Sequence, residues 1–537
     1  MNTTLESELI INCSVNWKIS YAKTVLQNSN SYEEKLEGWE AIRIATKPWL
    51  PQFVQLVKLH NRIAKGNGFN DYGDFLKSAY EIEDFDNVMS KLYNKLLPLY
   101  EQLHTYLRRK LIEQYPNKMT RLPLVPDHLL TGRSWSYLFE QTKPFPDKQK
   151  IDLKINEKME TLNYTVLQMY KMADNFLVSM GLPPVPQNVW DKSIFVKPKD
   201  RVFSCASHVF NFYDSYAIKT CGKVNFGGFK YAHYLITQVQ AFHLSSNQPV
   251  EFRNNIAPTF YYGVAAAVAL SASSPQHLKK IGILENYTSD IENYTSDREQ
   301  ELNALYSSAI SLLPSTISFL QEETWKGFVF KNEFNQNEWN RKWWSLREEL
   351  LGSHAPVPRP DDAFDGGIEL SVLRQQDSLR NFLNQVTRFQ FYKALCDVSG
   401  YNVSQNLHRC DFSNSEQAGA RIKAAFQIGR SRPTEEIIET ITGRKEIDAT
   451  ALLEYYQPLM DWLKLENQKA QDCFGWKEQE STSDFQRGRN DNLPIAQTPR
   501  CYHSDLYQNQ KAWAEVLFYI LEALINILKG FIFQDSR

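Results

Sequence analysis

The 537-residue chain lacks the short motifs that mark the common phosphate, cofactor and thiol chemistries. It contains no P-loop, no dinucleotide-binding fingerprint, no G-x-S-x-G elbow and no C-x-x-C pair. Its ten histidines are scattered, and no H-E-x-x-H pair sets two zinc ligands one helical turn apart. None of these chemistries therefore has a signature in the sequence.

An excess of charge of either sign is also missing, because 60 Lys and Arg residues are balanced by 62 Asp and Glu residues. This balance gives no electrostatic indication of a nucleic-acid partner, and a protein or peptide partner fits it better. Hydrophobic residues make up 42% of the chain, which is enough to build a core. A disordered protein is thereby excluded.

The amino terminus has no positively charged region, and its apolar run at Leu9–Ile11 is too short for a signal peptide, so the chain read literally starts in the cytosol. Seven cysteines include two regular spacings that a disulfide could close, Cys205 with Cys221 and Cys396 with Cys410. At least one thiol stays unpaired among Cys13, Cys473 and Cys501.

Asn-x-Ser/Thr sequons point the other way, because they would accept glycans in a secreted protein. They lie at Asn2, Asn12, Asn163, Asn286, Asn293 and Asn402. The alternative is chance, since an asparagine-rich chain produces several sequons. The secretory interpretation gains weight only together with the family resemblance given below.

Helical periodicity dominates the chain. In Met89–Lys110, Leu and Tyr recur at helical spacing, and cations gather at the end where the helix dipole favours them. Similar patterns predict helices at Ile155–Gly181, Glu299–Thr324, Gln376–Val398, Ser415–Phe426 and Ala449–Glu466. Strand-like alternation is scarce and is found at Ser193–Lys197 and Val202–Ser204. A mostly α protein with few short strands is predicted.

The carboxyl end combines a polar spacer with an apolar helix. Residues 477–511 are predicted to form a disordered linker, and residues 512–533 are as long as a membrane span. Polar side chains in this helix fall on one narrow stripe formed by Glu515, Glu522, Asn526 and Lys529. The helix could anchor in a membrane, lie on one, or dock onto a partner or its own body. The narrow polar face favours membrane contact.

From about Tyr32 to Trp476 the chain resembles the angiotensin-converting-enzyme family of zinc peptidyl dipeptidases, peptidase family M2. The resemblance lies in ordered strings: LHTYLRRKL, SMGLPPVPQNVWDKS, NFYDSYAIKTCGKVN, WWSLREELLG, APVPRP, FQFYKALC, SRPTEEIIETITG and YYQPLMDWLKLEN. It implies a two-lobed helical ellipsoid with a deep central cleft, and disulfides at both regular cysteine spacings. It also implies a partial amino-terminal segment, 1–30, past most of the family's lid helices, followed by a peptidase-fold domain, 31–476.

The family's zinc helix, A-H-H-E-M-G-H, corresponds to KYAHYLITQVQAF from Lys230. His233 matches the residue before the first ligand, but the two ligand positions hold Tyr234 and Gln238, and the catalytic glutamate's position holds Leu235. Downstream, TFYYGVAA replaces G-F-H-E-A-I-G-D and places Tyr262 at the third ligand position and Ala266 at that of a supporting aspartate.

These replacements predict that the chain uses no zinc and does not cleave peptides by the family mechanism. A neutral phenol with a pKa of about 10 and a carboxamide are poor zinc donors at neutral pH. Leu235 cannot accept a proton from a metal-bound water. The tyrosines at and beside these positions, Tyr234, Tyr261 and Tyr262, are interpreted mainly as repacked core. A new pocket lined by phenols is the alternative.

The resemblance also assigns positions that hold substrate or chloride in the family. Those that grip the peptide carboxylate, contact its backbone or stabilise the oxyanion have changed, to Arg133, Ala206, Glu369, Ser371, Ser378 and Asn381. Positions of the chloride sites are kept at Arg43, Tyr106, Trp343, Arg347 and Arg380. Buried arginines need anionic partners, so either chloride or nearby Asp or Glu side chains are expected.

The leading hypothesis is a catalytically inactive member of this family, of a kind that occurs among invertebrates, acting by binding or scaffolding. A glycosylated, extracellular or membrane-associated protein is expected, with an unidentified protein or peptide partner. One alternative is a decoy that sequesters peptides. The other is a metal-independent hydrolase, for which only the adjacent pair Ser207 and His208 offers a nucleophile and base.

Overall fold

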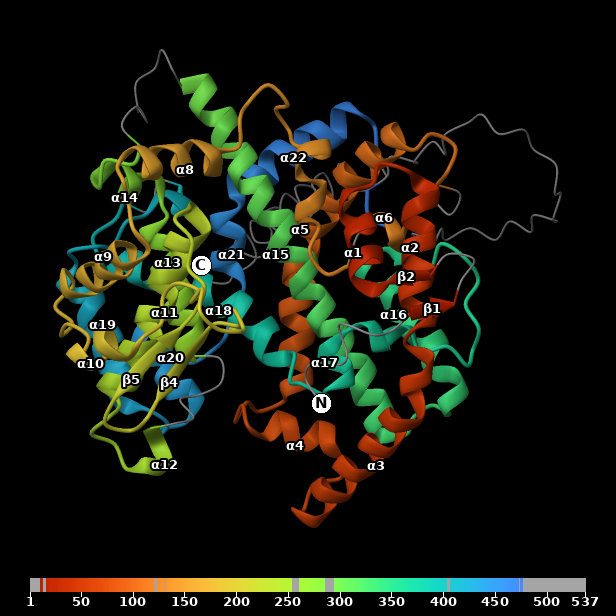
Figure 1. Ribbon diagram of the computed structural model, residues 1–537, viewed down its shortest axis with the longest axis horizontal. Helices are drawn as coiled ribbons and strands as arrows, with labels where there is room; N and C mark the ends of the chain where they lie inside the picture. The colour runs from red at the N-terminus through yellow and green to blue at the C-terminus, as the bar shows by residue number, and fades with distance from the viewer. Residues whose placement is uncertain are drawn as a thin grey trace, which may run out of the picture. The chain divides into compact units, whose positions relative to one another are not determined.

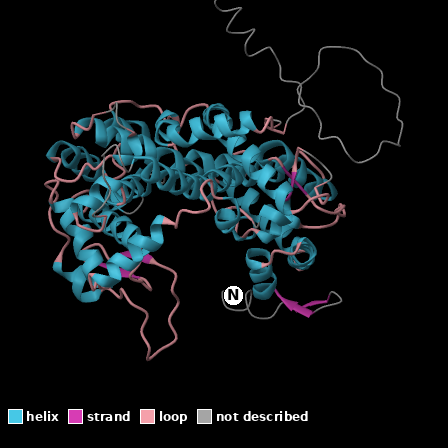
Figure 2. Cartoon of the chain, turned by 90° about the horizontal axis from the view of Figure 1, so that it is seen from above, coloured by secondary structure: helices cyan, strands magenta, loops and turns pink. Residues whose placement is uncertain are grey.

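The computed structural model describes residues 10–12, 16–119, 123–130, 132–253, 260–284, 294–402, 406–472 and 474–476. Helices dominate this part of the chain and the strands are short, as predicted (Figures 1 and 2). One compact unit comprises Met1–Lys469 with Phe474–Glu478. Several predicted features lie outside the described residues. They are the helix 512–533, the linker 477–511, Cys13, Cys473, Cys501, Asn286 and Asn293.

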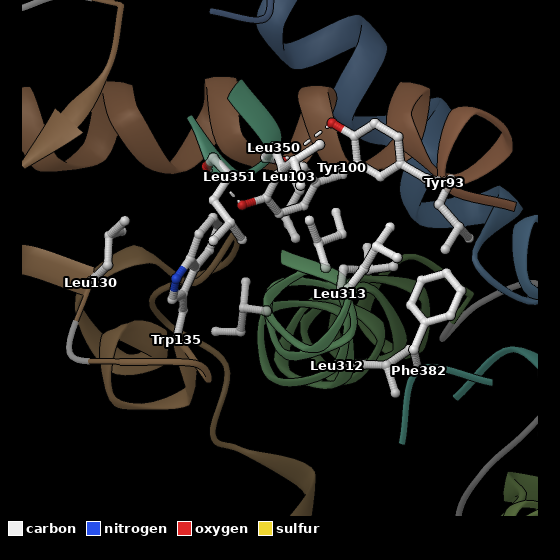
Figure 3. Packing of buried hydrophobic residues seen from close by; sticks show 14 of the residues in the cluster. Tyr93, Tyr100, Leu103, Leu130, Trp135, Leu312, Leu313, Leu350, Leu351 and Phe382 are labelled. Atoms are coloured by element: carbon white, nitrogen blue, oxygen red, sulfur yellow. Dashed lines mark hydrogen bonds between the residues drawn. The ribbon is translucent and has the colours of Figure 1, made fainter. Parts of the chain in front are cut away.

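The first hydrophobic core forms around the long helices α5 (Phe85–Gln114) and α15 (Tyr294–Lys331). Figure 3 shows their side chains meeting, with Tyr93 and Tyr100 of α5 facing Leu313 of α15. The two phenols donate hydrogen bonds to backbone carbonyls, Tyr93 to Leu350 at 3.3 Å and Tyr100 to Leu351 at 2.9 Å. Buried tyrosines thus satisfy their hydroxyls while filling the core.

Shorter helices complete this first core. They are α1 (Ile19–Asn28), α2 (Tyr32–Ile44), α3 (Leu50–Gly66), α4 (Tyr72–Ser78), α6 (Asp127–Leu130), α7 (Phe139–Thr142), α16 (Trp339–Leu351), α17 (Leu370–Leu373), α21 (Thr450–Tyr455) and α22 (Gln457–Lys469). One-turn 3₁₀ helices occur at Lys47–Trp49, Ser136–Leu138, Gln336–Glu338, Asp365–Ile368 and Leu407–Arg409.

The second hydrophobic core is built around α11 (Phe226–Leu244) and α13 (Phe260–Ala272), which pack against each other. Its other helices are α8 (Ile151–Thr161), α9 (Val166–Val178), α10 (Gln187–Lys192), α14 (Pro275–Lys280), α19 (Glu416–Ile428) and α20 (Thr434–Thr442). Helix α12 (Val250–Arg253) has no buried residue. The two cores correspond to the two lobes that the resemblance implied.

Helix α18 (Leu379–Val398) belongs to both cores. Its first half contributes Phe382 and Val386 to the first core, and its second half contributes Tyr392 and Leu395 to the second. A helix of this length spans about 30 Å, so one rigid element reaches through both hydrophobic clusters. It also carries Cys396, which forms the predicted disulfide with Cys410.

Three two-stranded sheets complete the fold. Strands β1 (Ile10–Asn12) and β2 (Asn16–Lys18) pair antiparallel, as do β4 (His208–Asn211) and β5 (Tyr216–Lys219), whereas β3 (Val125–Pro126) and β6 (Ser353–His354) are parallel. The predicted disulfide between Cys205 and Cys221 is formed beside the β4–β5 hairpin. Both cysteine pairings are therefore confirmed.

Several predicted boundaries were wrong. The helix expected at 155–181 is two helices, because Asn163 has a positive φ of 54° and the Thr165 hydroxyl caps α9 by accepting from the Gln168 amide at 3.2 Å. The helix expected at 449–466 breaks at Tyr456, next to Pro458 in the first turn of α22. Strands follow the predicted positions 193–197 and 202–204 instead of occupying them, apart from a single bridge at Ile194.

Three of the six sequon asparagines lie in the described residues: Asn12 at the end of β1, Asn163 and Asn402. The side chains of Asn163 and Asn402 are exposed, so both sites are accessible and glycosylation remains a prediction. Within the described ranges, no helix is both long and apolar enough to cross a membrane.

The contact between α13 and α18 depends on a glycine. A Cβ at Gly263 would lie 2.8 Å from both the Phe391 ring and the Thr387 hydroxyl. We expect Gly263→Ala to lower the thermal unfolding midpoint, with a cost of roughly 1–3 kcal/mol from overpacking. Gly327→Ala is the matched control, because a Cβ there meets no atom within 4 Å. It should be neutral or stabilising. Equal midpoints for the two variants would contradict this packing.

Candidate functional site

The positions expected to hold zinc lie on two adjacent helices, as the resemblance implied. Helix α11 begins at an Asn225 cap, whose side chain accepts from the Gly228 amide at 2.7 Å, and it carries Tyr234 into contact with α13. The rings of Tyr234 and Tyr262 are stacked with their centroids 6.4 Å apart. The first and third ligand positions are therefore neighbours in space, although 28 residues separate them in the sequence.

Aromatic rings occupy the first and third of the expected zinc-ligand positions, on α11 and α13. Tyr262 also lies 4.1 Å from Tyr261 between ring centroids, and Tyr234 stacks on Tyr231 at 5.7 Å. The Arg380 guanidinium of α18 sits above the Tyr262 ring at 5.5 Å. Burial, reinforced by the neighbouring Tyr262 phenol, raises the pKa of both Tyr234 and Tyr261 above the ordinary tyrosine value. These two phenols are neutral at physiological pH.

The remaining residues of the zinc-helix motif are interior side chains. His233, Leu235 and Gln238 are buried. The His233 Nδ1 is 2.9 Å from the Phe229 carbonyl oxygen, and its ring meets Phe176 edge to face. Burial lowers the pKa of His233 to about 3, so the ring is neutral and serves as packing.

This donor set does not fit zinc. Two phenols and one carboxamide replace the imidazoles and carboxylate that the metal prefers, and the rings of the two phenols stack on each other. Within the described ranges, no group of three His, Cys, Asp or Glu side chains is arranged to hold a metal ion. Tyr234 and Tyr261 are partly buried and pack against the second core, and Tyr262 is partly buried beside them.

Four of the expected substrate-holding positions lie around Glu322 of α15, a residue that the sequence analysis did not single out. Three of them contact Glu322 directly, and Glu369 joins through Arg133. The Arg133 Nε donates to Glu322 Oε1 at 2.6 Å, and its NH2 lies 3.0 Å from Glu369 Oε2. The hydroxyls of Ser371 and Ser378 donate to Glu322 Oε2 at 2.6 and 3.1 Å. The Arg133 NH2 also donates to the Ser371 hydroxyl. We call these five residues the Glu322 network.

The Glu322 network is satisfied internally. The Glu322 side chain has no exposed surface, and the Arg133 side chain is 25% exposed. Burial raises the pKa of Glu322 to about 7, and the charge on Glu369 adds to this rise while Arg133 opposes it. Arg133 is thus already engaged by two carboxylates from its own chain. The other two positions lie elsewhere: Ala206 is exposed, and Asn381 is in the first turn of α18.

Two of the expected chloride-site arginines share a carboxylate. The Arg43 NH2 is 2.6 Å from Asp127 Oδ2, the Arg347 NH2 pairs with Asp127 Oδ1, and all three side chains are buried. Burial alone would raise the pKa of Asp127, but Arg347 and Arg43 hold it below its ordinary value. The expected alternatives for these arginines were chloride or a nearby Asp or Glu side chain, and the structure shows pairing with a protein carboxylate. Sequence reasoning did not single out Asp127.

The other chloride-site positions are not all brought together. Trp343 packs edge to face on Trp325 in the first core, and Tyr106 packs against Tyr306 and Trp462. The Arg380 guanidinium, which lies over the Tyr262 ring, also acts on Tyr80: it opposes the burial that raises the pKa of this tyrosine, whose hydroxyl donates to Asp377. The Asp377 carboxylate accepts a hydrogen bond from the Arg380 backbone amide at 3.4 Å.

The hydrolase alternative finds no support in the contacts of its candidate pair. The Ser207 hydroxyl is 2.7 Å from the Thr220 hydroxyl, and the His208 ring packs on Phe210. Each side chain thus has another partner, and no contact between Ser207 and His208 is found among the described residues.

Comparison with known proteins identifies the family to which this helical chain belongs. Residues 7–476 match the family described as angiotensin-converting enzyme. The chain is 34% identical to the angiotensin-converting enzyme of Sus scrofa over 461 residues and to that of Mus musculus over 465 residues. It is 31% identical to that of Theromyzon tessulatum over 461 residues. The chain therefore belongs to the angiotensin-converting enzyme family.

The alignments cover 84% of this chain but different shares of its relatives. They cover 34% of the Sus scrofa and Mus musculus proteins and 73% of the Theromyzon tessulatum protein. The chain thus spans about a third of the length of the mammalian relatives.

The Glu322 network generates a pH prediction. The pKa of an ordinary glutamate is 4.5, and the pKa of Glu322 in the folded protein is about 7. The stability that the neutral form of Glu322 contributes is therefore complete below pH 4.5 and is lost as the pH rises through about 7. Glu322→Gln removes this titration. Relative to the unchanged protein, its thermal midpoint should rise between about pH 5 and about pH 8, by the equivalent of roughly 3 kcal/mol. The exposed Glu37→Gln is the control, and a pH-independent difference for Glu322→Gln would contradict the shift.

Asp127 generates a second prediction, on anions. Asp127→Asn leaves two buried arginines without their carboxylate, so we expect a loss of about 3–5 kcal/mol, partly restored when chloride replaces gluconate at constant ionic strength. The unchanged protein should show one thermal midpoint in both salts. Asp362→Asn, which removes an exposed ion pair with Lys47, should cost under about 1 kcal/mol. A chloride-dependent midpoint in the unchanged protein would show that a halide is still required.

Proposed function

We propose that this member of the angiotensin-converting enzyme family does not cleave peptides by zinc catalysis and acts by binding or scaffolding. The observation that carries the proposal is the residue set at the metal positions. Tyr234 and Tyr262 place stacked aromatic rings there, and Leu235 stands where a proton acceptor is needed. None of the three supplies the chemistry of a metal-bound, activated water.

The Glu322 network supports the same proposal from the substrate side. Arg133 is the cation best placed to receive a peptide carboxylate, but Glu322 and Glu369 already neutralise it. An incoming carboxylate would compete with two carboxylates held on the same chain and would meet the like charge of Glu369. The family's way of holding a dipeptide end is therefore unfavourable here.

We further propose an extracellular or membrane-associated location with a protein or peptide partner. The two disulfides support this location, because such bonds persist in oxidising compartments. The exposed sequons at Asn163 and Asn402 fit it as well. The family fold is kept because both cores are filled by packing that does not involve a metal.

Zinc titration by calorimetry tests the proposal against a rebuilt site. The unchanged protein should bind no stoichiometric zinc, whereas a variant with Tyr234→His, Gln238→His and Tyr262→Glu should bind one ion, since the same backbone then offers suitable donors. Adding Leu235→Glu to that variant should restore measurable cleavage of a short peptide substrate, which the three-substitution variant lacks. Tight stoichiometric zinc binding or metal-dependent cleavage by the unchanged protein would overturn the proposal.

A further inference from the structure

A cavity of about 640 Å³ lies against the first hydrophobic core, and no described residue of the degenerate site helices α11 and α13 lines it. Helix α15 contributes residues between Leu320 and Lys331, and α4, α5 and α16 flank this segment. All four helices are labelled in Figure 1. The volume lies in the range of small-molecule sites. The cavity is therefore separate from the site that the family resemblance marks.

The walls of this cavity are mostly apolar, and they follow a helix over several turns. Side chains from α5, α15 and α16 show this in turn: Phe85 and Met89, Leu320 and Phe328, Leu346 and Leu350. The segment of α15 that runs along the cavity, 320–331, spans about 16 Å. An apolar lining of this length suits an unbranched alkyl chain, because the hydrophobic gain grows with the apolar area removed from water.

A glycine in the interior of α15, Gly327, lines the cavity. Glycine destabilises a helix interior relative to alanine. A Cβ at Gly327 would meet no atom within 4 Å, so packing does not require the glycine. The missing side chain does let a ligand approach the helix backbone closely. Gly327 thus extends the space of the cavity up to α15.

One cation at the cavity is held by aromatic rings. The Nζ of Lys342 lies 4.7 Å from the centre of the Phe328 ring and 5.2 Å from that of Phe334, and these two rings meet edge to face. Glu338, one turn earlier in the chain, is ion-paired with Arg341 at 2.8 Å. Among the described residues, no carboxylate forms an ion pair with Lys342. Its charge is therefore available to an anion.

The other charges at the cavity give it a direction. Three pairs form within the chain: Lys77 with Asp86 at 2.6 Å, Lys326 with Glu323 at 2.5 Å, and Lys331 with Glu333 at 3.8 Å. Glu349 is exposed and lies about two turns along α16 from Lys342. The end at Lys342 thus carries a positive charge that no pair offsets, whereas the end at Glu349 is negative.

We propose that this cavity binds a single unbranched alkyl chain that ends in an anionic group, with the anion at Lys342 and the chain along α15 past Gly327. Lys342 attracts the anion and the apolar side chains cover the chain. Glu349 repels an anion and so disfavours the reverse orientation. The site uses no residue of the metal positions, so it does not depend on the proposed loss of catalysis. Two sources offer this chemistry, a free fatty acid and a single-chain lipid phosphate.

Calorimetric titration of the full chain tests the site with decanoate, decyl phosphate, hexanoate and 1-decanol, each below its micelle concentration. We expect decanoate, decyl phosphate or both to bind, and the tighter of the two identifies the source. Hexanoate should bind at least about tenfold more weakly than decanoate, because it buries fewer methylene groups. Decanol should also bind at least about tenfold more weakly, because it lacks the charge that Lys342 recognises.

A substitution at the glycine locates the bound chain. Gly327→Leu should weaken the bound anion at least about tenfold, because the new side chain fills the cavity. Gly66→Leu is the matched control, since a Cβ at this glycine of α3 also meets no atom within 4 Å but Gly66 does not line the cavity. Neither variant should lower the thermal midpoint without ligand, which also shows that both fold.

A substitution at the cation locates the anionic end. Lys342→Met should weaken the bound anion at least about tenfold and leave the binding of decanol unchanged, because it removes only the charge. Lys171→Met is the matched control: Lys171 also stacks on an aromatic ring, that of Trp190 at 3.4 Å, but does not line the cavity.

Three results would overturn the proposal. The first is that neither decanoate nor decyl phosphate binds the unchanged protein. The second is that hexanoate or decanol binds as tightly as the ten-carbon anions. The third is that folded Gly327→Leu or folded Lys342→Met binds these anions with unchanged affinity.

Discussion

One buried helix, α18, holds the two hydrophobic cores together. Its side chains are interior in both cores, so its position fixes where the first core ends and the second begins. Helix α13 approaches it so closely at Gly263 that no larger residue fits without a shift. The helices that carry the degenerate metal site are thus placed by side-chain packing. No ligand bond is needed to keep them there.

The same packing explains why the fold tolerates the residues at Tyr234 and Tyr262. A helix pair held at fixed separation leaves a volume that must be filled, and stacked aromatic rings fill it with little loss of contact. Burial raises the pKa of Tyr234, so this phenol stays neutral and adds no unpaired charge. The fold of this chain therefore depends on shape, whereas the proposed loss of catalysis depends on donor chemistry.

The cationic side chains of the interior have two kinds of partner, carboxylates and aromatic rings. In the Glu322 network and around Asp127, every buried arginine meets a carboxylate of the same chain. Such pairs are strongly coupled, and removing one partner leaves an uncompensated charge. Lys230 instead lies over the Phe226 ring at the wall of a cavity, and Arg388 lies over the Phe389 ring. Internal pairing closes the first two places to external anions.

Periodicity predicted the helical class and the major helices, because apolar spacing reports directly on which face of a helix is buried. It did not predict the breaks at Asn163 and Tyr456, which depend on single turn and cap residues. It also did not reveal the neighbours of Tyr106, which packs against Tyr306 and Trp462, or of Arg380, which lies over the Tyr262 ring. Residues far apart in sequence meet according to packing, which spacing does not reveal.

The sequence by itself determined the chemistry available at the metal positions, because a phenol, an aliphatic chain and a carboxamide keep their donor properties in any fold. It also determined which cysteines could pair, and both pairs formed. Only the tertiary structure decided which charges neutralise each other. Arg133 meets Glu322 and Arg43 meets Asp127 across 189 and 84 residues of chain. Coulomb energy depends on the distance between groups and on their burial, and folding alone sets both.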